Sequence, residues 1–340
     1  MSRPRPRRSE RGAALLAVLI LVAITGAIAA ASLERLRMSR LLSGNVIAVD
    51  QARQFAIGAE QLGVLIIDDL LALDRTRTTL AGGWNGGTRR IPMPGGGLVQ
   101  ARVRDGGNCF NVNSVVQGSL REGLARRQSG VDQFSGLMLL LGVPPAEAHR
   151  IAEAAADWAD SDSVPGPAGA EDAAYGQGAQ PFRTGNTLFA DVSELRALAG
   201  MRPEHYSRIR PYVCALPVAE LSPINVNTLL PEQAVLLSML APTRLSEAMA
   251  RRVLAVRPPA GWNQPTEFWR HEALSALGVP LEAQQQVRVR TDWFVLDISS
   301  NVAETQFFET ALVDARLQPA RVVRRRWERD AADAIVPGGP

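Results

Sequence analysis

An uncharged run near the N-terminus constrains this chain more than any other feature. Residues Ala13–Ala31 carry no charged side chain, and Glu34 is the first charge that follows them. At about 1.5 Å per residue, a helix of this length covers about 28 Å, close to the thickness of a bilayer's hydrocarbon core. A buried helix of a soluble protein usually shows one polar stripe, and this run shows none. The run therefore predicts a transmembrane helix.

A cleaved secretory signal peptide is the alternative interpretation. Its apolar region is usually about 7–15 residues long, and the small residues Ala27–Ser32 could form a cleavage site that leaves a mature chain starting near Ser32. The following residues favour a retained anchor, because no proline interrupts Ala13–Leu73. Apolar residues continue at helical spacing and predict a long amphipathic stalk: Leu33, Leu36, Leu41, Val46, Val49, Phe55, Ile57, Leu62, Leu65, Ile66 and Leu70.

The charge distribution predicts the orientation of this helix. The formal net charge is +3, but residues 1–12 hold five arginines and only one acid, Glu10. The remaining chain is therefore close to neutral, which argues against a polyanion-binding body. Positive flanks stay in the cytoplasm, so we expect a single-pass membrane protein with residues 33–340 on the other side of the membrane.

A basic leader, a glycine and a uniformly apolar helix together resemble the precursors of type IV pilin-like proteins. This resemblance implies cleavage by a prepilin peptidase between Gly12 and Ala13, followed by N-methylation of Ala13. Members usually carry glutamate at the fifth mature position, which is thought to neutralise the amine of a neighbouring subunit. This chain has Ala17 there. An unpaired buried charge is expensive, so a subunit without that glutamate suits the end of a filament.

Beyond the helix, the pattern predicts two groups of strands around a helical region. Leu98–Arg104 alternates as a half-buried strand does, the turn at Arg104–Gly107 indicates a hairpin, and residues 108–114 would be its partner or exit. A glycine-rich, flexible stretch, residues 81–97, comes before it. Alternation returns in three C-terminal segments that predict an antiparallel meander: Thr291–Ser299, Gln306–Leu317 and Ala320–Arg329. Residues 114–290 have helical spacing, with proline, Ser/Thr or Asp at several helix starts.

A short internal repeat lies within the helical region. FNVNSVV at Phe110–Val116 recurs as INVNTLL at Ile224–Leu230, and helices are predicted after both. Coincidence is the alternative to a true duplication. Asparagine before a helix can cap free N–H groups, so Asn113 and Asn227 are predicted to be helix caps.

Four strings together resemble the minor pseudopilin K family of the type II secretion system (GspK): INVNT, DWADSD with GAED, SELRALAG, and RPYVCALP. This similarity extends from Gly12 to about Trp327. It implies an α+β fold: a pilin-like long N-terminal helix and small antiparallel sheet, with a large inserted α-helical domain of SAM-like or helix-hairpin-helix-like character. It also implies an inner-membrane anchor with the C-terminal domain in the periplasm. There the chain would lie at the pseudopilus tip with minor pseudopilins I and J, with possible contact with the major pseudopilin.

Five carboxylates lie within the loop that follows one predicted helix: Asp157, Asp160, Asp162, Glu171 and Asp172. They repel one another unless they are solvated or neutralised. Hard oxygen ligands of this kind suit Ca²⁺, although the spacing does not match an EF-hand loop. Related subunits bind calcium in this region, so the resemblance strengthens the expectation of calcium here.

The two cysteines, Cys109 and Cys214, are far apart and have no metal-ligand spacing. Outside the cytoplasm they could form one disulfide; otherwise they are two buried thiols. Histidines His149, His205 and His271 belong to no catalytic motif, so we expect no enzyme. The segments Leu140–Pro145 and Ala276–Leu281 lack the second glycine of DNA-binding hairpins, so we expect no nucleic-acid partner.

These observations divide the chain into a leader (1–12), a transmembrane part (13–31), a pilin-like helix with first strands (32–112), an inserted α-domain (113–290), C-terminal strands (291–329) and a tail (330–340). In the assembled state the anchor would pack on partner helices, chiefly through Leu15, Leu16, Ala17 and Leu19. The predicted function is a minor pseudopilin that initiates or caps a pseudopilus for export of folded proteins. The alternatives are a minor pilin of a type IV pilus or competence system, and a secreted binding protein.

Overall fold

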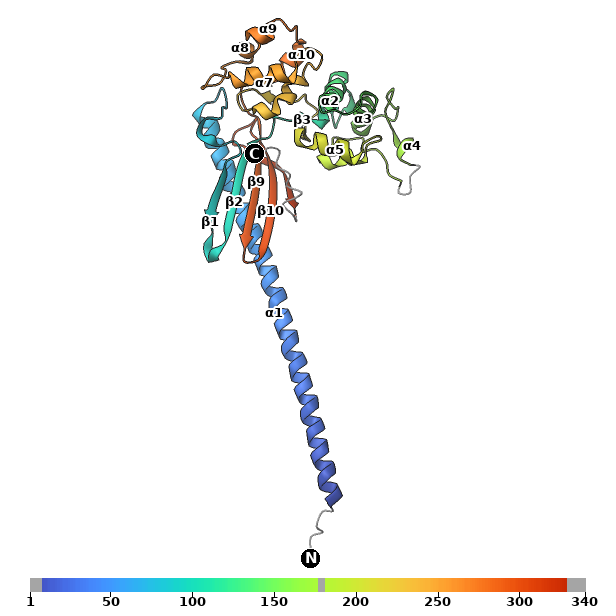
Figure 1. Cartoon of the computed structure of the whole chain (residues 1–340), viewed down its shortest axis with the longest axis vertical. Coiled ribbons are helices and arrows are strands. Elements are labelled where there is room, and N and C mark those ends of the chain that lie inside the picture. The colour runs from blue at the N-terminus through green and yellow to red at the C-terminus, as the bar shows by residue number, and fades with distance from the viewer. Residues whose placement is uncertain (1–7, 177–180, 329–340) are drawn as a thin grey trace, which may run out of the picture.

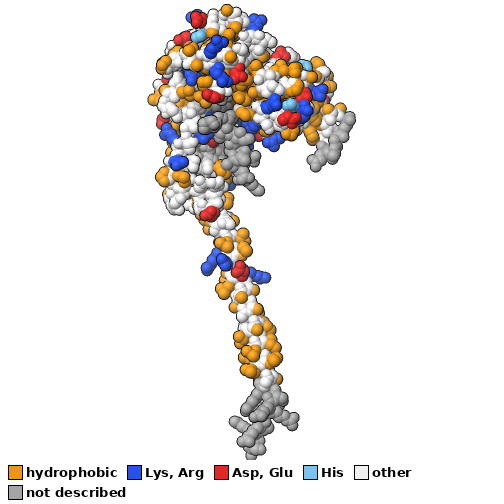
Figure 2. Space-filling view, in the orientation of Figure 1, with side chains coloured by type: hydrophobic (Ala, Val, Ile, Leu, Met, Phe, Trp, Pro, Cys, Tyr) orange, Lys and Arg blue, Asp and Glu red, His pale blue; other side chains and the backbone are white. Residues whose placement is uncertain are grey.

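A computed structural model describes residues 8–176 and 181–328. One helix, α1 (Arg8–Leu73), runs unbroken from the N-terminal region into the body of the protein. It projects alone from a compact head, as Figure 1 shows. Below the head its side chains are exposed on all sides, with hydrophobic residues interrupted by a charged belt at Glu34, Arg35, Arg37 and Arg40 (Figure 2).

The upper part of α1 covers one face of a five-stranded antiparallel sheet with strand order β1-β2-β9-β10-β11. Its strands are β1 (Thr88–Pro92), β2 (Leu98–Asp105), β9 (Trp293–Val302), β10 (Thr305–Asp314) and β11 (Arg321–Glu328). Alternating residues Phe294, Leu296 and Ile298 of β9 face the helix and form the core of this layer. The expected α+β, pilin-like fold is therefore confirmed.

The stripe of α1 that meets the sheet differs from the predicted one. Small residues Ala52, Ala56, Ala59 and Gly63 are buried, whereas the longer side chains of Leu62 and Leu65 are exposed. Helix and sheet approach so closely that a Cβ at Gly63 would lie 2.9 Å from Leu296. Close packing selects small side chains along this part of α1. The large side chains of Ile67 and Leu71 complete the core beyond it, and Phe55 and Leu70 of the predicted set pack against that core.

The hairpin partner of β2 was also predicted wrongly. β2 pairs with β1, which lies inside the glycine-rich stretch expected to be flexible, and with β9. After Asp105 the chain leaves the sheet, and Phe110–Asn111 forms β3, which pairs in parallel with β6 (Val213–Cys214). Short 3-10 turns, η1 (Ala81–Gly83) and η2 (Pro94–Gly96), shape the chain on either side of β1.

Two consecutive units occupy the segment between β2 and β9, and each begins with one copy of the internal repeat. The first contains β3, η3 (Val112–Val115), β4 (Val116–Ser119), β5 (Gly123–Arg126), α2 (Gln128–Leu140), α3 (Pro145–Ala159), α4 (Asp172–Tyr175), η4 (Val192–Ala197), α5 (Pro203–Ile209), η5 (Arg210–Tyr212) and β6. The second contains β7 (Ile224–Asn225), η6 (Pro231–Gln233), α6 (Ala234–Ser238), α7 (Glu247–Ala255), α8 (Pro265–Trp269), α9 (Glu272–Ser275), α10 (Leu281–Gln284) and β8 (Val287–Arg288). They form two lobes above the sheet (Figure 1).

The repeated asparagines are cross-links between distant segments. Asn113 Nδ2 donates to the carbonyls of Phe189 (3.0 Å) and Leu216 (2.7 Å), and Oδ1 accepts from the Phe189 amide at 2.7 Å. Asn227 repeats this pattern with Trp262 and Val289. The predicted role as helix caps is wrong: Asn111 caps η3, and its Oδ1 accepts from the Asn113 amide. Sequence spacing cannot reveal partners that lie 35 to 103 residues away.

Candidate functional site

The acidic loop after α3 brings three of its five carboxylates together. Asp160, Asp162 and Glu171 each offer an oxygen, and these oxygens all lie within 4.8 Å of one another. Asp160 follows directly on α3, and Glu171 directly precedes α4, so the fold of the intervening loop closes the cluster. Asp160 and Glu171 are buried, whereas Asp162 is exposed to solvent.

The other two predicted carboxylates hold the loop in place. Asp157 accepts hydrogen bonds from the Gly166 amide at 3.0 and 3.1 Å. Gly169 lies so close that a Cβ there would fall 1.8 Å from Asp157 Oδ2, so only glycine fits. Asp172 accepts from the amide and the hydroxyl of Thr184. These bonds explain why the chain turns back over the end of α3.

The electrostatics of the cluster favour a cation. Burial, followed by the charges of Asp162, Asp157 and Glu171, raises the pKa of Asp160 to about 7. Burial and then the Asp157 charge raise the pKa of Glu171. Within the described chain, Asp160 Oδ1 and Glu171 Oε1 have no hydrogen-bond partner. Buried oxygens left without donors match the ligands that Ca²⁺ takes in irregular loops, so these residues fit a calcium ion.

The N-terminal half of α1 is the second functional region. Leu15, Leu16 and Leu19 are 65%, 60% and 59% exposed, and Ala17 lies among them on the same bare helix. The helix passes without interruption through Gly12 and Ala13, both exposed. Among the described residues, α1 is the one helix long and apolar enough to cross a membrane. Nothing in the described head covers this surface.

The structure joins Cys109 and Cys214 by a disulfide, with their Cα atoms 5.8 Å apart. The bond lies where the first helical unit meets the sheet. The three histidines are dispersed. His205 is buried and bonds Glu147 at 2.5 Å, His271 caps α9, and exposed His149 lies 3.8 Å from Glu153. Each therefore has a local structural contact.

Sequence reasoning overlooked two buried carboxylates between α1 and the sheet, Glu60 and Glu309. Arg325 donates to Glu60 at 2.8 Å, whereas the oxygens of Glu309 accept no hydrogen bond within the described chain, and Arg325 Nε lies 3.9 Å from one of them. Burial, followed by the neighbouring Glu60 carboxylate, raises the pKa of Glu309 to about 7. The position of Glu60 within the small-residue stripe of α1 was the sequence signal that could have identified this buried pair. Within the run Arg324–Arg326, Arg325 lies against α1, whereas its two neighbours lie on the opposite face of the sheet and contact Ala190 and Asp191.

Comparisons with known proteins agree with this architecture. Family models described as "Type II secretion system (T2SS), protein K" match residues 108–218 and 224–290. Proteins named "Type II secretion system protein K" from Pectobacterium carotovorum and Klebsiella pneumoniae are both 33% identical to the chain. Each alignment covers 94% of this chain, with 97% and 96% of those proteins respectively. A solved chain in the GspK-GspI-GspJ complex of enterotoxigenic Escherichia coli matches with a TM-score of 0.71 at 29% identity. That match covers 83% of this chain and 97% of the solved one.

Proposed function

Because this chain belongs to the type II secretion system protein K family and is a minor pseudopilin, we propose that it occupies the tip of a short periplasmic pseudopilus. The observation that carries this proposal is the similarity, over nearly the whole of the solved chain, to a structure that also contains GspI and GspJ. We therefore propose the corresponding pseudopilins I and J as direct partners and the major pseudopilin as the next subunit below. The role is structural, with no catalytic step.

The uncovered half of α1 supports this assignment physically. Its apolar side chains need lipid before assembly and neighbouring helices after it, because about 25 cal/mol is lost for each Å² of apolar surface left in water. Ala17 presents no charge to a neighbour. The two-lobed head is much wider than α1 (Figure 1), so another subunit would not fit above it. We propose that this subunit starts or caps the filament, which then grows from below.

Maturation at the cytoplasmic end follows from the same assignment. We propose that a prepilin peptidase cuts between Gly12 and Ala13 and that Ala13 is then N-methylated, with residues 13–31 retained. Mass spectrometry of the mature N-terminus tests this step, and a chain that begins near Ser32 would overturn it.

Assembly is tested by co-purification from membranes. The full chain is expected to isolate pseudopilins I and J together, and loss of either partner should reduce recovery of the other. Ala17→Glu should lower pseudopilus formation, while Ala17→Leu, which adds bulk without charge, should have a smaller effect. Unchanged assembly of the glutamate variant would contradict the charge argument.

We propose that Asp160, Asp162 and Glu171 hold a Ca²⁺ ion. Asp160 and Glu171 are buried, and each has one oxygen that accepts no hydrogen bond within the described chain, which supports the assignment. When bound, the ion would supply positive charge that neutralises them and fixes the loop between α3 and α4. Asp157 and Asp172 position that loop through their hydrogen bonds to Gly166 and Thr184.

A further inference from the structure

The face of the sheet that α1 leaves uncovered carries an ordered set of arginines. Strand register places Arg102, Asp297, Thr310 and Arg326 in one row across β2, β9, β10 and β11. The adjacent row contains Arg104, Val295, Leu312 and Arg324. Each row thus ends in an arginine on both sides. Neighbouring strands lie about 4.8 Å apart, so the two ends of a row are separated by about 14 Å.

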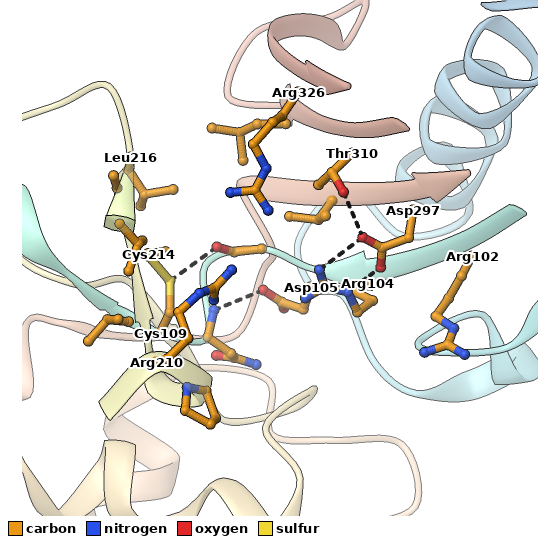
Figure 3. A pocket seen from close by; sticks show the side chains of 18 of the residues that line it. Arg102, Arg104, Asp105, Cys109, Arg210, Cys214, Leu216, Asp297, Thr310 and Arg326 are labelled. Atoms are coloured by element: carbon orange, nitrogen blue, oxygen red, sulfur yellow. Dashed lines mark hydrogen bonds and ion pairs between the residues drawn. A yellow bond between two sulfur atoms is a disulfide. The ribbon is translucent and has the colours of Figure 1, made fainter. Parts of the chain in front are cut away.

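A cleft forms where this face meets the first helical unit, and it is shown in Figure 3. Both rows line its floor, while Arg210 of η5 and the Cys109–Cys214 disulfide line the opposite wall. Asp105, Asp191 and Asp297 are the carboxylates of the lining, against five arginines. Asp105 accepts from Thr228 and Thr291, which fixes it within the wall. The cleft therefore has an excess of positive charge.

Internal ion pairs use part of that charge, Arg324 donates to the backbone carbonyl of Ala190, and Arg102 and Arg210 remain. Arg104 bonds Asp297 at 2.6 and 3.1 Å, and Arg326 bonds Asp191 at 2.9 Å. Within the described chain, Arg102 and Arg210 have no carboxylate at ion-pair distance. Guanidinium groups bind carboxylates in a planar, two-pronged geometry, so one such group on the floor and one on the facing wall suit a segment with more than one carboxylate.

A second, more apolar pocket adjoins this cleft. Arg210 and Pro211 line both cavities, which therefore meet at η5. Met201, Pro203 and Tyr206 supply the apolar wall of the second pocket, and Arg196 lies over the Tyr206 ring at 4.6 Å. A chain passing from the first cavity to the second would meet positive charge first and an apolar recess next.

We propose that this composite groove binds an extended acidic segment of a partner polypeptide that carries an apolar side chain beyond its carboxylates. Charge complementarity identifies the segment: carboxylates lie between Arg102 and Arg210, and the apolar side chain enters the pocket beside Tyr206. This role goes beyond the proposed place at the filament tip. The experiment measures peptide binding to the isolated subunit. A negative result would therefore contradict only the groove proposal, because pseudopilus assembly is tested separately by co-purification.

The experiment uses the full chain in detergent micelles and two labelled peptides, acetyl-EDEDGF-amide and its uncharged counterpart acetyl-QNQNGF-amide. Fluorescence anisotropy should show at least about tenfold tighter binding of the acidic peptide at low salt, with loss at about 0.5 M salt. Arg102→Glu with Arg210→Glu should weaken that binding by about tenfold or more. The milder pair Arg102→Gln with Arg210→Gln should weaken it less, and covers the case in which charge reversal prevents folding.

Matched controls separate this groove from general positive charge. Arg90→Glu with Arg252→Glu alters exposed arginines that lie outside both cavities and should leave binding unchanged. Equal binding of both peptides, or equal loss in the control variant, would overturn the proposal. Competition by inorganic phosphate at the peptide's own concentration would indicate a simple anion site and also overturn it. A large gain in affinity for the acidic peptide after truncation at Glu328 would also overturn the proposal, because the acids of the chain's own C-terminus would then be the occupants of the groove.

Discussion

The two units inserted into the sheet share a framework and differ in what stabilises it. Each starts with Asn-Val-Asn, pairs a short strand in parallel with a strand at its own end, and uses the second asparagine to bridge two later segments. The first unit adds a disulfide and an acidic loop. In the second, Trp262, Phe268 and Trp269 pack edge to face, and no disulfide is present.

This difference shows where added cross-links are needed. The segment that joins α3 to α5 in the first unit is long and contains only short helical turns, and its aromatic residues Tyr175, Phe182 and Phe189 pack on Trp158 at the end of α3. Covalent and ionic cross-links can add to such contacts in a long segment, because they restrict the open chain without requiring a larger core. In the second unit, short segments return directly onto the aromatic cluster. The expected effects below follow this contrast from the largest to the smallest.

The largest effect is expected for the disulfide. Replacing both cysteines, Cys109→Ser with Cys214→Ser, should lower the free energy of unfolding by about 2–5 kcal/mol, since the bond closes a long loop. Urea unfolding of the full chain measures this change, and limited proteolysis should locate it in the first unit. Reduction of the unaltered protein should give the same midpoint as the variant. A variant that unfolds like the parent would remove the disulfide from the comparison.

The second largest difference between the two units is expected in their response to calcium. Added Ca²⁺ should raise the melting temperature. At a Ca²⁺ concentration of about 100 times the Kd, binding stabilises the folded state by about 2.7 kcal/mol. Asp162→Asn alters an exposed ligand and should abolish this response without unfolding the chain. Glu247→Gln, at a partly exposed helix position of the second unit, is the control and should respond as the parent does. A calcium response that persists in Asp162→Asn would contradict the assigned ligands.

The bridging asparagines should reveal what the units have in common. Asn113→Ala and Asn227→Ala each remove three buried hydrogen bonds and leave backbone groups without partners. Each should cost about 2–3 kcal/mol of unfolding free energy. The Asn113 variant should lose slightly more, because its longest bond is 3.0 Å whereas Asn227 has one of 3.4 Å. If only one substitution destabilises the protein, the repeated motif is not structurally equivalent in the two units.

The smallest effect should come from Glu309, which lies in the sheet beneath both units. Its pKa is about 7 in the folded chain, above its ordinary value of 4.5. The folded state therefore keeps a proton that the unfolded chain releases, so this residue's contribution is full below about pH 4.5 and declines as the pH rises to about 7. Glu309→Gln should raise the melting temperature at pH 8 by a few degrees, at about 2–4 °C per kcal/mol, and change it little at pH 4.5. An equal shift of the melting temperature at both pH values would exclude titration of Glu309 as the cause. Because Glu309 lies in the sheet and in neither helical unit, the difference in stability between the two units should not change.

Particular residues show how far sequence reasoning reached. The run Ala13–Ala31 and the alternation of β9 and β10 predicted α1 and two central strands, because helix and strand periodicity are local properties. β1 was missed, since five residues within a glycine-rich stretch are too few for a pattern. All five acids of the loop were identified, but only the folded loop separates the three that converge from the two that hold hydrogen bonds.

The sequence by itself determined the anchor, the near-neutral body, the α+β class and the presence of two repeated motifs. These properties depend on composition and on spacing along the chain. Only the tertiary structure decided which stripe of α1 packs on the sheet, which segments the asparagines join, and that Arg102 and Arg210 face one cleft. Those outcomes depend on contacts between residues far apart in sequence, and such contacts are selected by packing and hydrogen bonding in three dimensions.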